Sequence, residues 1–95
     1  MTPDRPTLVF FTSRSSGQAR RMESLLAHIA RKERGRLHVR KVDVEDRPDL
    51  AERFRVQKVP HLALVVESRV VSKLEGRATA PRIESMLEPH LPAVA

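Results

Sequence analysis

The residues best suited to nucleophilic chemistry in this chain are Ser16 and His61. A serine–histidine catalyst needs a hydrogen bond between the two side chains, a third group that orients the histidine, and an oxyanion hole. The sequence offers Asp43 as a poor third member and contains no Gly-x-Ser-x-Gly turn that would expose the serine. The favoured interpretation of Ser16 is structural, because a serine hydroxyl readily accepts a hydrogen bond from the free N–H groups at a helix start.

Cysteine is absent from all 95 residues, and its absence removes a further class of chemistry. Thiol–disulfide exchange requires one thiolate that attacks and a second sulfur that resolves the mixed disulfide. The histidines are scattered along the chain without the spacing of metal ligands. They are His28, His38, His61 and His90. The sequence therefore predicts no metal site and no cofactor.

Positive charge is concentrated in one part of the chain, whose net charge as a whole is +6. Between positions 14 and 41 nine Lys or Arg residues stand against two Glu. Such a surface attracts phosphates, acidic proteins or anionic lipid, although an Arg-rich helix face can also be merely solvated. Nucleic acid is the less favoured anion, because the only aromatic residues are three Phe and stacking platforms are missing. The candidate anion-binding residues are Arg14, Arg20, Arg21, Arg31 and Arg34.

Hydrophobic patterning predicts one α/β domain. Residues 7–12 form an unbroken apolar run, typical of a central strand covered on both faces. A helix is expected from about 17 to 34, capped by Ser15 or Ser16 and ended by Gly35. The further expected elements are a strand over 37–43, a short helix from 48, strands over 61–66 and 69–74 joined by a turn at 67–68, and a helix from 79 to 89. The residues expected in the core are Phe11, Leu25, Ile29, Val42, Leu64 and Leu87.

The boundaries of the domain follow from the same pattern. We expect a disordered N-terminal tail over residues 1–6, a folded domain over 7–90 and a C-terminal tail over 91–95. The apolar runs are strand-sized and too short to span a membrane, and the N-terminus does not have the pattern of a signal peptide. A cytoplasmic location is expected, and the absence of cysteine agrees with it.

The order βαβαββα, with a proline before the third strand, resembles the thioredoxin family across residues 7–90. The family's extra N-terminal strand and helix are the parts without a counterpart. The specific part of the resemblance is the spacing: from Ser16, where the family's nucleophilic cysteine would lie, Pro60 follows after 44 residues and Gly76 after 60. The resemblance implies a four-stranded mixed sheet flanked by helices, and a cis peptide bond between Val59 and Pro60.

The departures from the family's pattern agree with one another. Ser16 and Ala19 replace both cysteines of the redox motif. Ser15 replaces the tryptophan before the motif, Gln18 the proline inside it, and Phe10 the buried acid that assists proton transfer in the family. Gly17 and Lys41 keep the family's residue type. We therefore expect a thioredoxin-like domain without redox activity and without another enzymatic activity.

The function that the resemblance implies is binding of a protein or peptide in the groove beside the cis-proline, by strand addition that needs no cysteine. His61 is expected near Ser16, as a partly exposed residue that lines this groove. The expected groove residues are Ser15, Ser16, Gly17, Gln18, Val59, Pro60, His61, Gly76 and Arg77. The alternative is binding of an anionic ligand or nucleic acid by the basic first helix and its N-terminus. No membrane partner is expected.

Overall fold

The computed structural model describes residues 5–92, so of the predicted tails (1–6 and 91–95) the parts at 1–4 and 93–95 lie outside the described residues. The elements follow the predicted order. They are β1 (Thr7–Thr12), α1 (Gly17–Lys32), β2 (His38–Asp43), α2 (Pro48–Arg53), β3 (His61–Val66), β4 (Arg69–Glu75), α3 (Ala80–Leu87) and the 3-10 turn η1 (Glu88–His90). Pro6, which the sequence assigned to a tail, is buried, and its carbonyl oxygen accepts a hydrogen bond from the His38 N–H at 2.9 Å.

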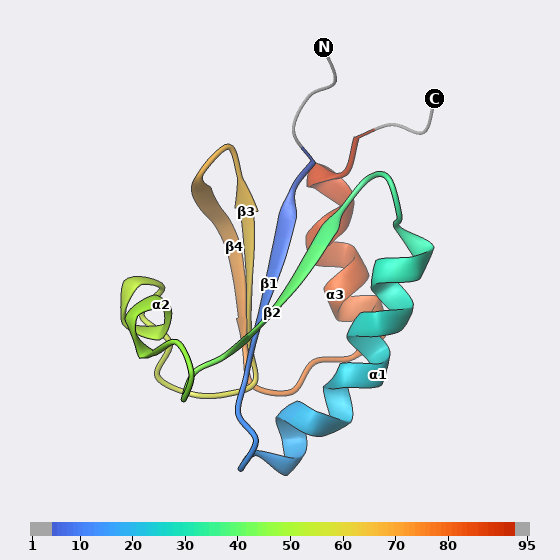
Figure 1. The fold of residues 1–95 in the computed structure, drawn as a ribbon. Coiled ribbons are helices and arrows are strands. Elements are labelled where there is room, and N and C mark those ends of the chain that lie inside the picture. Colours follow the sequence, from blue (N-terminus) through green and yellow to red (C-terminus); the bar gives the residue numbers. More distant parts are fainter. Residues whose placement is uncertain (1–4, 93–95) are drawn as a thin grey trace.

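The four strands form one mixed sheet in the order β2-β1-β3-β4. β2 runs parallel to β1, whereas β3 is antiparallel to β1 and β4 is antiparallel to β3. Helices α1 and α3 cover one face of the sheet, and α2 lies on the other (Figure 1). The predicted fold class is confirmed, and the apolar run at residues 7–12 is indeed a central strand.

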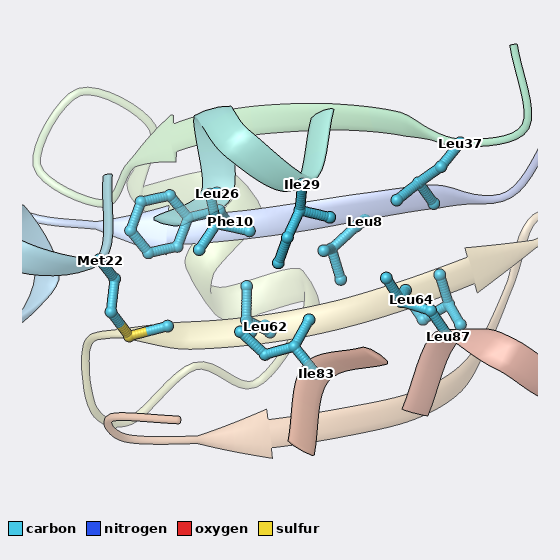
Figure 2. Packing of buried hydrophobic residues seen from close by; sticks show 10 residues of the cluster. All are labelled: Leu8, Phe10, Met22, Leu26, Ile29, Leu37, Leu62, Leu64, Ile83 and Leu87. Carbon is cyan, nitrogen blue, oxygen red and sulfur yellow. The ribbon is translucent and has the colours of Figure 1, made fainter. Parts of the chain in front are cut away.

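The larger core lies between the sheet and the helices α1 and α3 (Figure 2). Alternate residues of β1 and β3 point toward this side, because side chains alternate across a strand. Helix α1 contributes three apolar residues at spacings of four and three, which place them on one helical face. The buried members are Leu8, Phe10, Met22, Leu26, Ile29, Leu37, Leu62, Leu64, Ile83 and Leu87.

Leu25 does not belong to the fully buried core, so that part of the core prediction is wrong. Leu26 is only 2% exposed, whereas Leu25 is partly exposed and packs against the edge of the cluster. The apolar residues of α1 form a stripe wider than its contact with the sheet, and Leu25 lies on the flank of that stripe. The other expected core residues are buried: Phe11, Ile29, Val42, Leu64 and Leu87.

A smaller core lies on the opposite face, beneath α2. Val9, Phe11, Val42 and Ala63 are its buried members, and Leu50 and Phe54 from the α2 region pack against them. The rings of Phe11 and Phe54 have centroids 5.2 Å apart. With only six residues, α2 depends on these contacts for its position, because a helix of this length is not stable alone.

Helix α1 ends at Lys32, two residues earlier than predicted. The residue after it, Glu33, is buried, and its carboxylate pairs with the Arg36 guanidinium at 2.5 Å. Gly35 lies in the following turn with φ of +91°, a conformation that glycine adopts without a side-chain clash. The glycine thus serves the turn into β2 and does not directly follow the last helical residue.

The turn between β3 and β4 is formed by Glu67 and Ser68, as predicted, with φ of 51° and 68°. Two successive positive φ angles match the right-handed twist of a tight hairpin. Within residues 5–92 no helix has the length and apolar character needed to cross a membrane.

Candidate functional site

Three loops meet at the end of the sheet where β1 finishes (Figure 1). They connect β1 to α1, α2 to β3, and β4 to α3. The strand register explains the convergence, since Phe11 near the end of β1 pairs with His61 at the start of β3, and His61 pairs with Glu75 at the end of β4. Residues separated by more than 40 positions in the chain therefore share one edge of the molecule.

Ser16 is the N-cap of α1, as the sequence predicted. Its backbone is extended, with φ of −99° and ψ of 110°, and its Oγ accepts a hydrogen bond from the Ala19 N–H at 3.1 Å. The hydroxyl is therefore engaged in holding the first helical turn. Gly17 and Gln18 follow on the exposed side of that turn.

The α2–β3 and β4–α3 loops are joined through Pro60. The Val59–Pro60 peptide bond is cis, Pro60 is buried, and its carbonyl oxygen accepts a hydrogen bond from the Gly76 N–H at 2.7 Å. Gly76 has φ of +78°, which disfavours other residues. Within residues 5–92 the main-chain groups of Val59 and Arg77, on either side of this junction, form no hydrogen bond.

His61 does not line the groove, so its predicted position is wrong. Its side chain is 0% exposed and points toward the α2 face, where its ring lies 5.7 Å from that of Phe11 in an edge-on arrangement. Neither Nδ1 nor Nε2 has a hydrogen-bond partner among the described residues, so no Ser16–His61 pair exists. Burial lowers the pKa of His61, an effect opposed by the nearby Glu75 carboxylate and reinforced by Lys73.

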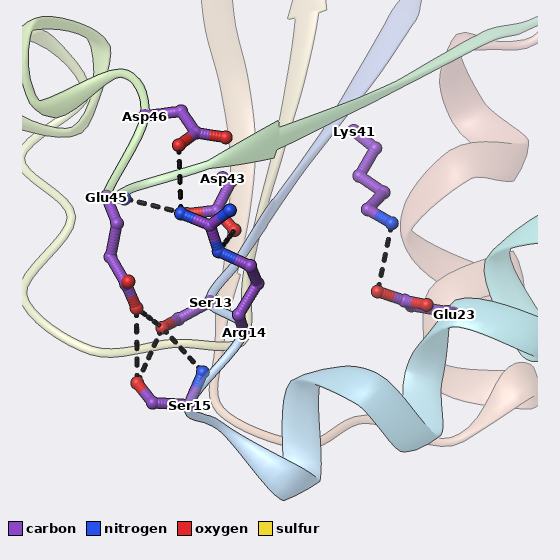
Figure 3. A network of polar contacts seen from close by, with 8 residues as sticks. All are labelled: Ser13, Arg14, Ser15, Glu23, Lys41, Asp43, Glu45 and Asp46. Atoms are coloured by element: carbon purple, nitrogen blue, oxygen red, sulfur yellow. Dashed lines mark hydrogen bonds and ion pairs between the residues drawn. The ribbon is translucent and has the colours of Figure 1, made fainter.

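A polar network beside Ser16 was not anticipated from the sequence (Figure 3). The Ser13 hydroxyl donates to Glu45 Oε1, the Ser15 hydroxyl donates to the same oxygen at 3.2 Å, and the two hydroxyls lie 2.9 Å apart. Arg14 pairs with Asp46 at 3.1 Å. The network ties the β1–α1 loop to the β2–α2 loop. One feature of the sequence could have indicated this contact: β1 and β2 are parallel strands, and the loops that follow parallel strands lie at the same edge of the sheet.

The predicted basic face divides into separate groups. Arg14 and Arg20 line a cavity of about 340 Å³ together with Lys41 and the carboxylates of Glu23 and Asp43. Arg31 and Arg34 lie at the other end of α1, and Arg31 is about 16 Å from Arg20 along the helix axis at 1.5 Å per residue. Arg21 is exposed between them. The arginines therefore do not converge on one anion.

The Thioredoxin family model matches residues 1–89. The chain belongs to the thioredoxin family. Thioredoxin 1 of Chlorobaculum tepidum is 32% identical over 75 residues, covering 79% of this chain and 74% of that protein. Thioredoxin of Alicyclobacillus acidocaldarius subsp. acidocaldarius is 29% identical over 84 residues, covering 88% and 80%. A bifunctional thioredoxin reductase/thioredoxin of Mycobacterium leprae is 29% identical over 94 residues, covering 96% of this chain, which spans only 20% of that protein's length.

Two residues show how this thioredoxin-family domain is built without a redox centre. Phe10, at the position of the family's buried acid, is 1% exposed and lies within the larger aliphatic core (Figure 2). Lys41 keeps the family's residue type, and its Nζ pairs with the Glu23 carboxylate of α1 at 3.0 Å (Figure 3). The lysine thus has an acidic partner that belongs to the helix and lies outside the core.

Proposed function

We propose that this chain is a redox-inactive thioredoxin-family domain that binds an extended segment of a partner protein. The binding surface, here called the Pro60 surface, comprises Ser15, Ser16, Gly17, Gln18, Val59, Pro60, Gly76 and Arg77. The observation that carries the proposal is the main chain of Val59 and Arg77, which makes no hydrogen bond to any residue of 5–92 and is held side by side through the Gly76–Pro60 hydrogen bond. Backbone groups presented in this way can pair with an incoming extended chain, whose side chains then supply specificity. The domain would act as an adaptor in the cytoplasm, with no catalytic step of its own.

The proposal predicts no disulfide reductase activity. With dithiothreitol as reductant, insulin reduction in the presence of this protein should match the blank without protein, because a serine oxygen at position 16 can neither attack nor resolve a disulfide. A cysteine-containing thioredoxin serves as the positive control. Turnover above the blank, from material shown by mass spectrometry to be free of other thioredoxins, contradicts redox inactivity.

Anion or nucleic-acid binding by α1 is not the function that the geometry favours. Arg14 is already paired with Asp46, and in the cavity beside Arg20 the Lys41 amine is paired with Glu23 while Asp43 supplies a second carboxylate. Both features oppose the approach of a further anion. The residues of the basic helix are therefore suited to serve as controls for the Pro60 surface.

A displayed library of random peptides, selected against the wild-type protein, tests the Pro60 surface. Selected peptides should shift the amide NMR signals of Val59 and Arg77. Gly17→Arg should weaken their binding by about tenfold, equivalent to about 1.4 kcal/mol. A Cβ at position 17 meets no atom within 4 Å, so the new side chain can project over the surface without an internal clash.

The matched control carries Arg31→Glu and Arg34→Glu at the far end of α1. This variant should bind the same peptides with unchanged dissociation rate and should alter only the association rate and its salt dependence. If the helix reversal abolishes binding and Gly17→Arg binds normally, the basic helix replaces the Pro60 surface as the binding site. If no selected peptide shifts Val59 or Arg77, the proposal fails.

A further inference from the structure

Strand β2 forms one margin of the sheet, with β1 as its only neighbour within residues 5–92 (Figure 2). The His38 N–H donates to Pro6 and the Val44 N–H donates to Thr12, both at 2.9 Å, so the even-numbered residues bond toward β1. Alternation along the strand turns the N–H and C=O groups of Val39 and Lys41 away from the sheet. Such an edge can template a further strand.

An apolar cleft of about 210 Å³ lies next to this edge, between α1 and β2. Phe10 and Leu26 form its floor, while Ala27, Ala30 and Val39 line its sides and Glu23 and Lys41 its polar rim. Ala27 is exposed and Ala30 is partly exposed, so their small side chains leave the cleft open toward solvent. In a strand placed beside β2, every second side chain would point to the α1 side, where this cleft can receive it.

The charge along the edge favours one kind of occupant. Arg40 and His38 are exposed on the opposite face of β2, and Arg40 has no ion pair among the described residues. Pairing of β2 with β2 of a second copy would bring positive side chains against each other, and like charges across paired strands are destabilising. A strand with carboxylates on that face would instead be attracted.

We propose that the edge of β2 and the adjoining cleft bind an extended acidic segment of a partner protein as an additional strand. Its small apolar side chains enter the cleft beside Ala27 and Ala30, and its Asp or Glu side chains face Arg40. This site is separate from the Pro60 surface and does not depend on it.

The test uses a capped synthetic peptide that alternates Val with Glu or Asp, and a control peptide that alternates Val with Lys. The acidic peptide should protect the Val39 and Lys41 amides from hydrogen exchange and leave the Val59 and Arg77 amides unchanged. Arg40→Glu should weaken binding of the acidic peptide by about fivefold and strengthen binding of the Lys peptide. Ala27→Glu should weaken the acidic peptide by about tenfold, because the new carboxylate fills the cleft and repels the segment. Arg82→Glu, at an exposed position of α3, should have no effect.

Several outcomes overturn the inference. Equal binding of both peptides, binding without protection at Val39 and Lys41, or no binding of the acidic peptide at millimolar concentration each contradict it. Protection of the same two amides by self-association without peptide would identify a second copy as the occupant. Protection confined to Val59 and Arg77 would support the Pro60 surface and exclude this one, so the two proposals fail separately.

Discussion

Replacing Leu26 by alanine is expected to lower the free energy of unfolding by about 2–5 kcal/mol. The side chain lies 2% exposed where α1 packs on the sheet, among the aliphatic residues of the larger core. Truncation removes buried apolar area and leaves a cavity that the surrounding strands and helices fill only in part. For a domain whose total stability is of the order of 5–15 kcal/mol, this loss is severe. Urea unfolding followed by far-UV circular dichroism measures it without needing tryptophan or tyrosine, which the chain lacks.

The neighbouring leucine provides the matched control. Leu25→Ala makes the same chemical change one position earlier, on the flank of the helix, and should cost only about 1–2 kcal/mol, because water already reaches part of the side chain. The helical propensities of the two variants are identical. If the two losses are equal, or Leu25→Ala is the worse, then the face that α1 presents to the sheet is assigned wrongly.

Acid should destabilise this domain through His61. In the unfolded chain the imidazole takes up its proton near the ordinary pKa of 6.5, whereas in the folded protein burial holds its pKa lower. Above 6.5 the histidine is neutral in both states and contributes no pH dependence. Below 6.5 the unfolded state binds more protons than the native state, so the free energy of unfolding falls as the pH falls, with a limiting slope of about 1.4 kcal/mol per pH unit.

The variant His61→Leu isolates this contribution. Leucine fits the apolar surroundings and removes two buried nitrogens that have no partner in residues 5–92, so stability at neutral pH should be maintained or raised. The decrease in the free energy of unfolding below pH 6.5 should become less steep, because the variant lacks the one proton that His61 takes up on unfolding. His28→Gln, at an exposed position of α1, should keep the wild-type profile. An unchanged slope in His61→Leu would show that His61 becomes protonated in the folded state as easily as in the unfolded chain.

Local sequence signals were sufficient for most of the fold. The unbroken apolar run of β1 indicated a strand covered on both faces, and Ser16 before a helical pattern indicated a cap. The spacing of Pro60 and Gly76 from Ser16 identified the family and the loops that meet at the site. Each of these signals is either a residue pattern within one segment or a number of residues between two segments, and both can be read from a single sequence.

The errors came from tertiary contacts that the sequence does not record. The alternation of side chains along β3 predicts on which face of the sheet His61 lies, but it cannot reveal that Phe11 packs against His61 on that face. Likewise, α1 carries apolar residues over more of its circumference than the sheet covers, so Leu25 and Leu26 could not be ranked by periodicity. The contact of Glu45 with Ser13 and Ser15 joins two loops about 30 positions apart, and no local pattern marks it.

The burial of Phe10 bears on what would be needed to introduce thiol chemistry into this domain. Cysteines at positions 16 and 19 would be small changes, but an acid at position 10 would place a carboxylate among Leu8, Leu26 and Leu62. Lys41, the register neighbour of position 10 on β2, is already paired with Glu23, and an unpaired buried charge is costly. An acid introduced at position 10 would lower stability before any activity was gained. The larger core is therefore shaped for an apolar side chain at position 10 and offers no site for a buried carboxylate there.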